Sequence, residues 1–303
     1  MTLVALDWGT TSLRGARLAA DGTVIEERSF ARGILTVEQG GFAAVFDNLF
    51  GDWMPPGALC LIAGMAGSQQ GWLEAPYYPC PAGFADITAR LAWVQKNRIA
   101  IVPGLSLDKQ GTLDVMRGEE TQVFGVLQQL GLSDARMVLP GTHSKWVTVT
   151  DRHITDFSTW MTGEFYALLR QHSILARTLP AFSAVSNPMN EPALDAAAFN
   201  QGVAQALRGN SLLHTAFSTR TLALFKRMPE HALPSYLSGL VIGEEVKCQT
   251  LEPGQTIIVA GTEALAKRYE LAFKHTGVQV QHTGSNPTWC GLRAIADTLD
   301  SVR

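Results

Sequence analysis

The feature that most constrains this chain is a strand–loop–strand pattern that occurs twice. Apolar residues 3–6 lead into Asp7 and a Gly-Thr-Thr-Ser loop, and a second strand-like run follows at 13–18. About 130 residues later, residues 137–140 lead into a Gly-Thr-His-Ser-Lys loop and a further run at 146–150. Short apolar runs joined by turn residues are typical of β-hairpins. The sequence therefore predicts two related halves, each with such a hairpin.

The chemistry of the first loop suits phosphate binding. Gly9 permits a tight bend close to a ligand. Consecutive N–H groups, together with the hydroxyls of Thr10, Thr11 and Ser12, can form a cradle for phosphate oxygens. Asp7, at the end of the strand, is placed to hold a hydrated Mg2+ that bridges those oxygens. For this stretch alone, an ordinary Asp-Gly turn between two strands is the alternative.

Strands and amphipathic helices alternate along the rest of the chain, which predicts an α/β fold. Continuous apolar runs are typical of strands covered on both faces, and helical spacing of apolar residues predicts the helices. Strands are expected at 23–30, 59–63, 99–102, 154–157, 256–260 and 278–281, and helices at 42–50, from 119, from 162, within 195–250, after Thr262 and at 289–299. The domain junction is expected at 133/134.

Composition argues against several classes of protein. The 303 residues carry a net charge of −3 and contain no basic run, which disfavours a nucleic-acid surface. The chain enters a strand at once without a signal-peptide pattern, and no apolar stretch approaches the ~18 residues of a membrane span. The four cysteines are widely spaced, which favours free thiols in a reducing cytosol over disulfides or a zinc site. We expect a cytoplasmic protein that binds neither membrane nor nucleic acid.

Carboxylates gather ahead of the second hairpin, at the start of a predicted helix. Glu119 and Glu120 lie in its first turn, and Asp114 lies just before it. A helix N-terminus favours negative charge in any protein, so the position also has an ordinary structural explanation. Phosphoryl transfer needs a carboxylate that orients and deprotonates the accepting hydroxyl, which makes these residues candidate bases.

A polar loop follows the predicted strand at 59–63. Ser68 and Gln69 offer hydrogen-bond donors and acceptors for hydroxyl groups, and Trp72 offers a flat apolar wall. These residue types suit a sugar, although a compact surface loop would explain them as well.

Four blocks of the sequence resemble the 2-dehydro-3-deoxygalactonokinases, within the superfamily of actin-like ATPases, sugar kinases and Hsp70 proteins. The blocks are Asp7-Trp8-Gly9-Thr10-Thr11-Ser12-Leu13-Arg14, Gly64-Met65-Ala66-Gly67-Ser68-Gln69-Gln70-Gly71-Trp72, Val115-Met116-Arg117-Gly118-Glu119-Glu120-Thr121-Gln122 and Pro140-Gly141-Thr142-His143-Ser144-Lys145-Trp146. The third and fourth are the specific ones, whereas the first is shared more loosely across the superfamily. The similarity extends to 237–243 and 259–262, and so covers nearly the whole chain.

The resemblance implies a two-domain actin-like ATPase fold of the ribonuclease H-like type. Each domain would be a mixed sheet flanked by helices, with ATP in the cleft between the domains. Domain 1–133 would carry the first phosphate hairpin and the sugar loop, and domain 134–303 the second hairpin and the adenosine site. The implied activity is ATP- and Mg2+-dependent phosphorylation of the 6-hydroxyl of 2-dehydro-3-deoxy-D-galactonate, a step of galactonate catabolism.

The resemblance also implies roles for individual residues. Glu119 follows Gly118 where glycerol-kinase-like relatives have a catalytic aspartate after a glycine, and Glu120, Asp114 and Asp7 complete the catalytic candidates. Asp7 is also the expected metal ligand. The expected ATP contacts are Gly9, Thr10, Thr11, Ser12, Gly141, Thr142, His143, Ser144 and Lys145 at the phosphates, with Gly261 and Thr262 at the adenosine. The expected substrate contacts are Gly67, Ser68, Gln69, Trp72, Arg14, Arg117, Thr162, Gly163 and Glu164.

Several alternatives stay open at this point. Arg14 and Arg117 are equal candidates for binding the substrate carboxylate. Lys145 is as well explained as a solvated lysine, and 162–164 as a helix N-cap. The fold would also suit a kinase for a related 2-keto-3-deoxy sugar acid, a phosphohydrolase, or a non-catalytic ATP-switched module. The sequence also leaves open whether the protein forms a homodimer.

Overall fold

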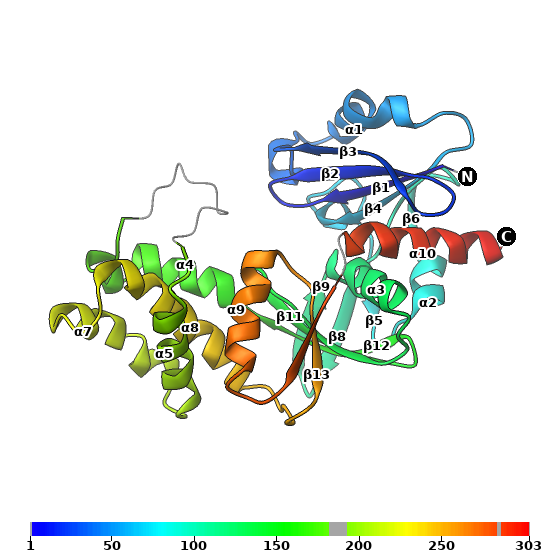
Figure 1. Cartoon of the computed structure of the whole chain (residues 1–303). Helices are drawn as coiled ribbons and strands as arrows, with labels where there is room; N and C mark the ends of the chain where they lie inside the picture. Colours follow the sequence, from blue (N-terminus) through cyan, green and yellow to red (C-terminus); the bar gives the residue numbers. More distant parts are fainter. Residues whose placement is uncertain (1, 182–192, 284–285, 303) are drawn as a thin grey trace. The chain divides into compact units, whose positions relative to one another are not determined.

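The computed structural model describes residues 2–181, 193–283 and 286–302 (Figure 1). The chain forms two compact units. Unit 1 comprises Met1–Arg136, Val147–Thr159 and Thr283–Arg303, and unit 2 comprises Met137–Trp146 and Trp160–His282. The first break in the chain lies close to the expected junction at 133/134.

The C-terminal helix, which the expected boundary placed in the second domain, belongs to unit 1. This helix, α10 (Pro287–Val302), packs against α3 (Glu119–Leu130) and α2 (Phe84–Ala89). Glycines let α3 and α10 cross at backbone contact: a Cβ on Gly125 would lie 1.7 Å from the carbonyl oxygen of Pro287. This close crossing fixes α3, whose first turn carries the candidate carboxylates.

The first sheet has the strand order β3-β2-β1-β4-β7-β6. Its strands are β1 (Leu3–Trp8), β2 (Leu13–Leu18), β3 (Val24–Phe30), β4 (Leu59–Gly64), β6 (Ala92–Gln95) and β7 (Ile99–Ile101). Strand β2 pairs antiparallel with both β1 and β3. On the other side of β1, the pairs β1–β4 and β4–β7 are parallel. The predicted N-terminal hairpin is therefore confirmed as β1–β2.

The second sheet repeats this plan, with the order β12-β11-β10-β13-β14. Its strands are β10 (Ala135–Leu139), β11 (Ser144–Thr150), β12 (His153–Trp160), β13 (Thr256–Val259) and β14 (Gln279–His282). As in the first sheet, the earliest strand pairs in parallel with the fourth strand, β13, which pairs in parallel with one further strand, β14. The structure confirms the internal repeat and the α/β class with mixed sheets.

Helices occupy the expected segments. They are α1 (Phe42–Phe50), α3, α4 (Thr162–His172), α5 (Ala196–Leu207), α6 (Leu212–Thr215), α7 (Ser218–Leu224), α8 (Leu233–Lys247), α9 (Glu263–Phe273) and α10. Within the described ranges, no helix has both the length and the apolar character needed to cross a bilayer.

A third, small sheet was not predicted. It consists of β5 (Tyr78–Pro79), β8 (Leu105–Lys109) and β9 (Thr112–Met116). The side chains of β9 are mostly exposed and do not alternate between buried and exposed, so the period of two that indicates a strand is missing. Asp114 lies on β9, ahead of the helix α3, which begins at Glu119.

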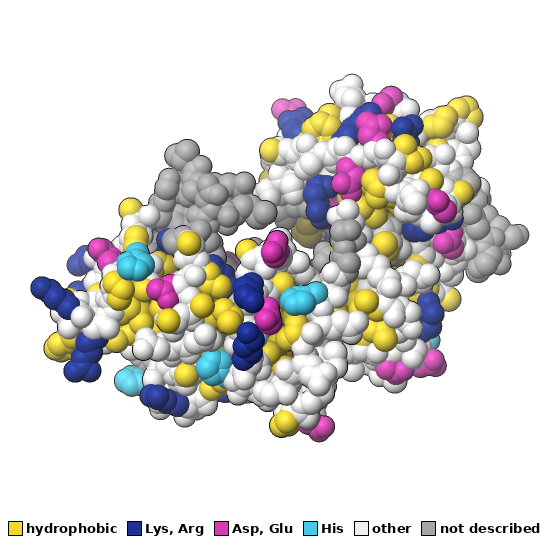
Figure 2. Space-filling view, in the orientation of Figure 1, with side chains coloured by type: hydrophobic (Ala, Val, Ile, Leu, Met, Phe, Trp, Pro, Cys, Tyr) yellow, Lys and Arg dark blue, Asp and Glu magenta, His cyan; other side chains and the backbone are white. Residues whose placement is uncertain are grey.

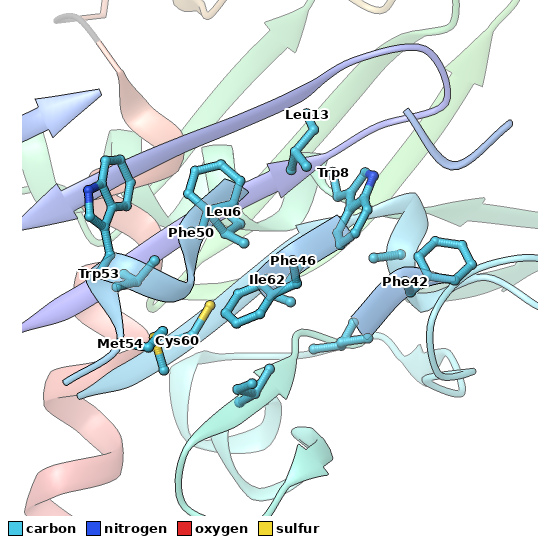
Figure 3. Close-up of a cluster of buried hydrophobic side chains, with 14 of the residues drawn as sticks. Leu6, Trp8, Leu13, Phe42, Phe46, Phe50, Trp53, Met54, Cys60 and Ile62 are labelled. Atoms are coloured by element: carbon cyan, nitrogen blue, oxygen red, sulfur yellow. The ribbon is translucent and has the colours of Figure 1, made fainter. Parts of the chain in front are cut away.

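The core of unit 1 fixes β1 along its length. Leu6 and Trp8 of β1 are fully buried and lie beside Phe46 and Phe50 of α1 (Figure 3). Successive side chains of a strand point to opposite faces of the sheet. Asp7 therefore points to the face away from α1.

Candidate active site

The loop between β1 and β2 is a tight turn held by its own backbone. The Gly9 N–H donates to the carbonyl oxygen of Ser12 at 2.9 Å, and the carbonyl of Gly9 accepts from the Ile34 N–H at 3.0 Å. Thr10 and Thr11 are exposed. The backbone of Gly9 is thus engaged with the protein, while the threonine side chains reach solvent.

Asp7 lies at the end of β1 and is paired with an arginine. Its Oδ2 accepts from Arg14 Nη2 at 2.6 Å, across the antiparallel register that sets the two residues opposite each other. The Asp7 side chain is 23% exposed. The guanidinium of Arg14 also lies 5.8 Å from the centre of the Trp289 ring.

Two glycines bring the start of α3 to this end of β1. Gly64, at the end of β4, has φ +90°, and a Cβ there would lie 2.9 Å from the Trp8 carbonyl oxygen and 3.3 Å from Asp7 Oδ1. Gly118 has φ +104°, and a Cβ there would lie 3.2 Å from the Gly64 Cα. Positive φ and this close approach both favour glycine. Asp7, the Gly9 turn and the first turn of α3 therefore belong to one region of unit 1.

The two glutamates of that first turn have different environments. Glu120 is fully buried, and its carboxylate accepts from the Gly118 N–H at 2.7 and 3.0 Å. Glu119 is partly exposed, and its Oε2 accepts from the Arg117 N–H at 3.0 Å. Burial, and then the neighbouring charge of Glu119, raises the pKa of Glu120 to about 8. Only Glu119 of the pair reaches solvent.

The raised pKa of Glu120 makes a pH-dependent stability prediction. From its ordinary value of 4.5 up to about 8, the unfolded chain has lost this proton while the folded chain keeps it. The free energy of unfolding therefore falls as pH rises through that window, by at most about 1.4 kcal/mol per pH unit for one group. Glu120→Gln removes this dependence, and its amide oxygen can still accept from Gly118. We expect the melting temperature of the variant relative to wild type to rise from pH 5 to pH 8; a pH-independent difference would contradict the buried, protonated state.

The carboxylate of Asp114 is held by hydrogen bonds within the protein. Its two carboxylate oxygens accept from the Thr159 N–H and hydroxyl, both at 2.6 Å, and Oδ1 also accepts from the Val115 N–H at 2.8 Å. These bonds join β9 to β12 within unit 1. They account for this carboxylate without a role in proton transfer.

In the described part of the chain, buried polar atoms without a hydrogen-bond partner occur on Ser68, in the loop after β4, and on Arg117, just before α3. Arg117 donates through Nη2 to the Ala75 carbonyl at 2.7 Å, and its Cζ lies 4.3 Å from the centre of the Tyr77 ring. Within the described part of the chain, Arg117 Nε and Nη1 and Ser68 Oγ are buried and form no hydrogen bond. Gly67 lies against this guanidinium, because a Cβ there would be 2.7 Å from Nη1.

The other two predicted sugar contacts of this loop differ from each other. Gln69 is exposed. The ring of Trp72 lies 5.4 Å from Phe46 and 6.0 Å from Trp8, centre to centre, and packs against the core of unit 1. Core packing therefore explains Trp72 without a bound sugar.

In unit 2, the 141–145 loop is held by the start of α4. His143 Nε2 lies 2.6 Å from Glu164 Oε2, and the Glu164 N–H donates to the Thr142 carbonyl at 3.1 Å. A Cβ on Gly163 would lie 2.6 Å from the Gly141 carbonyl oxygen, so only glycine fits there. The observed contacts of Gly163 and Glu164 are thus with the loop itself.

The strand that follows this loop is anchored by a buried carboxylate on α8. Glu245 is 2% exposed and accepts from Trp146 Nε1 at 2.7 Å, from Tyr269 Oη at 2.8 and 2.9 Å, and from the Thr162 hydroxyl. Ser144 Oγ in turn lies 3.0 Å from Tyr269 Oη. Burial raises the pKa of Glu245, and the hydrogen bonds it accepts oppose that rise.

Sequence reasoning missed Glu245 and Tyr269 as parts of the site. The available signal was the pair Glu244 and Glu245 at the end of the mostly apolar 236–246 stretch, because a carboxylate buried there needs hydrogen-bond partners. Lys145 was left open as a solvated lysine, but it is only 5% exposed.

A small cavity of about 60 Å3 lies beside Gly141 in unit 2. Its walls come from α4, α8 and α9 and from the end of β10, and include Pro140, Tyr166, Val241, Leu265 and Arg268. The predicted adenosine residues Gly261 and Thr262 immediately precede α9, and a Cβ on Gly261 would lie 3.2 Å from Pro140 Cδ. The apolar lining and the adjacent glycine loop are of the kind that binds a nucleotide base, but the cavity is smaller than a nucleoside and would have to widen to admit one.

Asp7 fits a magnesium site of the kind found with nucleotides. In the part of the chain that the structure describes, no three His, Cys, Asp or Glu side chains are grouped to hold a metal. Mg2+ in kinases is usually held by one or two carboxylates together with substrate phosphates and water. A single partly exposed carboxylate beside a phosphate turn meets that requirement.

Comparison with known proteins gives a consistent assignment. A family model described as 2-keto-3-deoxy-galactonokinase matches residues 7–295. The 2-dehydro-3-deoxygalactonokinase of Escherichia coli (strain K12) is 35% identical over 300 residues, which is 98% of each chain. "Probable 2-dehydro-3-deoxygalactonokinase DgoK1" of Rhizobium meliloti (strain 1021) is 34% identical over 303 residues, covering 97% of this chain and 96% of the relative. The crystal structure of a Sinorhizobium meliloti protein assigned to the same activity superimposes with a TM-score of 0.84, at 31% identity and 99% coverage of both chains.

Proposed function

The chain belongs to the 2-keto-3-deoxy-galactonokinase family, and on that premise we propose that it phosphorylates the 6-hydroxyl of 2-dehydro-3-deoxy-D-galactonate with ATP. The observation that carries the proposal is the grouping of Asp7, the Gly9 turn and Glu119 through the glycines at 64 and 118. These are the parts that phosphoryl transfer requires: a metal carboxylate, a phosphate turn and a base. The product would be the 6-phosphate, an intermediate of galactonate catabolism.

Glu119 is the proposed general base. It is partly exposed and lies in the first turn of α3, whereas Glu120 is buried and Asp114 is held by Thr159. In the reaction, Glu119 would accept the proton of the 6-hydroxyl while that oxygen bonds to the γ-phosphorus and the bond to the ADP oxygen breaks.

Both hairpin loops are proposed contacts of the ATP phosphates. The backbone N–H groups that follow Gly9 in its turn, and those of the Gly141–Lys145 segment, would donate to the phosphates, since such loops form anion-binding concavities. The cavity beside Gly141 and the Gly261-Thr262 loop would widen to hold the adenosine. Mg2+ bound by Asp7 would neutralise charge that develops on the phosphate oxygens. Arg14 would have to release the Asp7 carboxylate when the metal binds.

Arg117 is the proposed partner of the substrate carboxylate. Arg117 has two buried nitrogens that form no hydrogen bond in the described part of the chain, whereas the side chain of Arg14 is 48% exposed and can be solvated. A buried unpaired donor costs about 1–3 kcal/mol, which is the sign of a missing acceptor. Because both nitrogens are covered here, the carboxylate would reach them through a shift of the loop that carries Tyr77, as is common when a loop closes on a ligand.

Replacing Arg117 should weaken sugar-acid binding selectively. We expect Arg117→Met to raise KM for the sugar acid about 10- to 100-fold, the range of a lost charge-assisted hydrogen bond, and to leave KM for ATP within about twofold. Arg90→Met is the matched control, since Arg90 also lies over a tyrosine of this loop, 5.7 Å from the Tyr78 ring centre. Steady-state kinetics with each substrate varied in turn would check this. An unchanged KM for the sugar acid would exclude Arg117 from the role.

The activity itself can be tested by identifying the product. With ATP, Mg2+ and 2-dehydro-3-deoxy-D-galactonate, 31P NMR should show one new phosphomonoester coupled to the protons of C6. Inorganic phosphate as the sole product would instead indicate a phosphohydrolase. We expect the enzyme to act in the cytoplasm, where its nucleotide is available.

A further inference from the structure

Four segments of unit 2 that surround the predicted nucleotide site meet at one buried carboxylate. Glu245 of α8 accepts hydrogen bonds from Trp146 of β11, Thr162 of α4 and Tyr269 of α9. We propose that Glu245 is a positioning residue for ATP: it holds the 141–145 loop, the start of α4 and α9 in the arrangement that binds the nucleotide. This inference rests on the proposed function.

The contacts connect the carboxylate directly to the loop. Trp146 immediately follows Lys145, and Ser144 is tied to the network through the Tyr269 hydroxyl at 3.0 Å. Thr162 precedes Gly163, whose Cα lies against the Gly141 carbonyl, and Glu164, whose N–H donates to Thr142. A movement of the Glu245 side chain would therefore release the loop from both sides.

The hydrogen-bond donors around position 245 require a side chain there that accepts several hydrogen bonds. Trp146 Nε1 can only donate, and the hydroxyls of Thr162 and Tyr269 each donate to the carboxylate in this arrangement. A carboxylate can accept from all three, because it has two oxygens with several lone pairs. A glutamine of the same shape would turn an NH2 group toward one of these donors and leave buried polar atoms unpaired. The isosteric change is therefore a severe test of the network.

The network lies on the wall of the small cavity beside Gly141. Thr162 and Tyr269 line that cavity together with Gly141 and Gly163. The same side chains thus meet Glu245 on one side and the proposed nucleotide space on the other. Loss of Glu245 would change the shape of this space, and the substrate loop of unit 1 contains no member of the network.

The test is nucleotide affinity, measured by calorimetry with ADP and Mg2+ in the absence of any sugar acid. We expect Glu245→Gln to weaken ADP binding about tenfold, the effect of losing one or two hydrogen bonds to a charged group. Steady-state KM for ATP should rise by a similar factor, while KM for the sugar acid stays within about twofold. Glu244→Gln is the matched control, because Glu244 pairs with Lys247 at 2.6 Å on the same helix and lies outside the network. Its ADP affinity should equal that of wild type.

Thr162→Val provides a second variant if Glu245→Gln does not fold, since it removes one hydroxyl and keeps the side-chain shape. It should weaken ADP binding severalfold without changing the KM for the sugar acid. Wild-type ADP affinity in a folded Glu245→Gln or Thr162→Val protein would overturn the inference, and so would an equal rise in both KM values. The proposed function fails separately, if the wild-type protein binds ADP but does not phosphorylate the sugar acid.

Discussion

Glu119→Gln should lower kcat at least about a hundredfold, the usual contribution of a general base, with ATP binding retained. The amide has the same size and can still accept from the Arg117 N–H, so the first turn of α3 should keep its shape. It cannot accept the proton of the attacking hydroxyl. Rapid-mix measurement of the phosphoryl-transfer step, together with ADP affinity by calorimetry, would separate lost chemistry from lost binding.

Glu120→Gln is the matched control for this experiment. The buried Glu120 accepts from the Gly118 N–H, and an amide oxygen can replace its carboxyl oxygen there. We expect its kcat to stay within a few-fold of wild type. Near-normal turnover in Glu119→Gln, or a collapse in Glu120→Gln alone, would transfer the role of base to another residue.

Asp7→Asn should have the second large effect, a loss of at least about a hundredfold in kcat/KM for Mg2+·ATP. Mg2+ strongly prefers carboxylate oxygens, and an amide oxygen without charge is a weaker ligand. The variant should still fold, because the side chains of Asp7 and its partner Arg14 are 23% and 48% exposed, so neither is left buried without a partner. A titration of rate against free Mg2+ should show a much higher concentration for half-maximal activity in the variant.

Asp21→Asn is a suitable control, since Asp21 caps the next turn of the same sheet by accepting from the Thr23 N–H and hydroxyl. Its dependence on Mg2+ should match that of wild type. If Asp7→Asn also keeps the wild-type Mg2+ dependence, the metal is held elsewhere.

The parts of the fold that could be predicted are those specified locally. The apolar runs around the Gly9 and Gly141 loops define their hairpins, and the apolar stripe after Glu119 defines its helix. A hydrophobic period and a turn are properties of a few neighbouring residues, so a sequence reveals them directly. The repetition of this pattern also predicts two related halves, and the two sheets share one plan.

What could not be predicted depends on residues far apart in the chain. The return of α10 to unit 1 is made possible by Gly125 and Gly291, two glycines whose partners lie far away in sequence. The burial of Glu245 and the pairing of Arg14 with Asp7 are also set by tertiary packing. For the same reason, the resemblance favours Glu119 as the base but leaves Glu120 and Asp114 as alternatives, and only the structure shows how the three differ in burial and partners.

The most direct test of the proposed function is the rate of ADP formation with different acceptors. Purified protein with ATP and Mg2+ should turn over with 2-dehydro-3-deoxy-D-galactonate, with kcat/KM at least about tenfold above that for the gluconate epimer. Without an acceptor the rate should be a small fraction of this value, because a kinase must not transfer its phosphoryl group to water. An equal rate without acceptor would contradict the account and indicate an ATP hydrolase, and no turnover with any acceptor would indicate a non-catalytic ATP-binding protein.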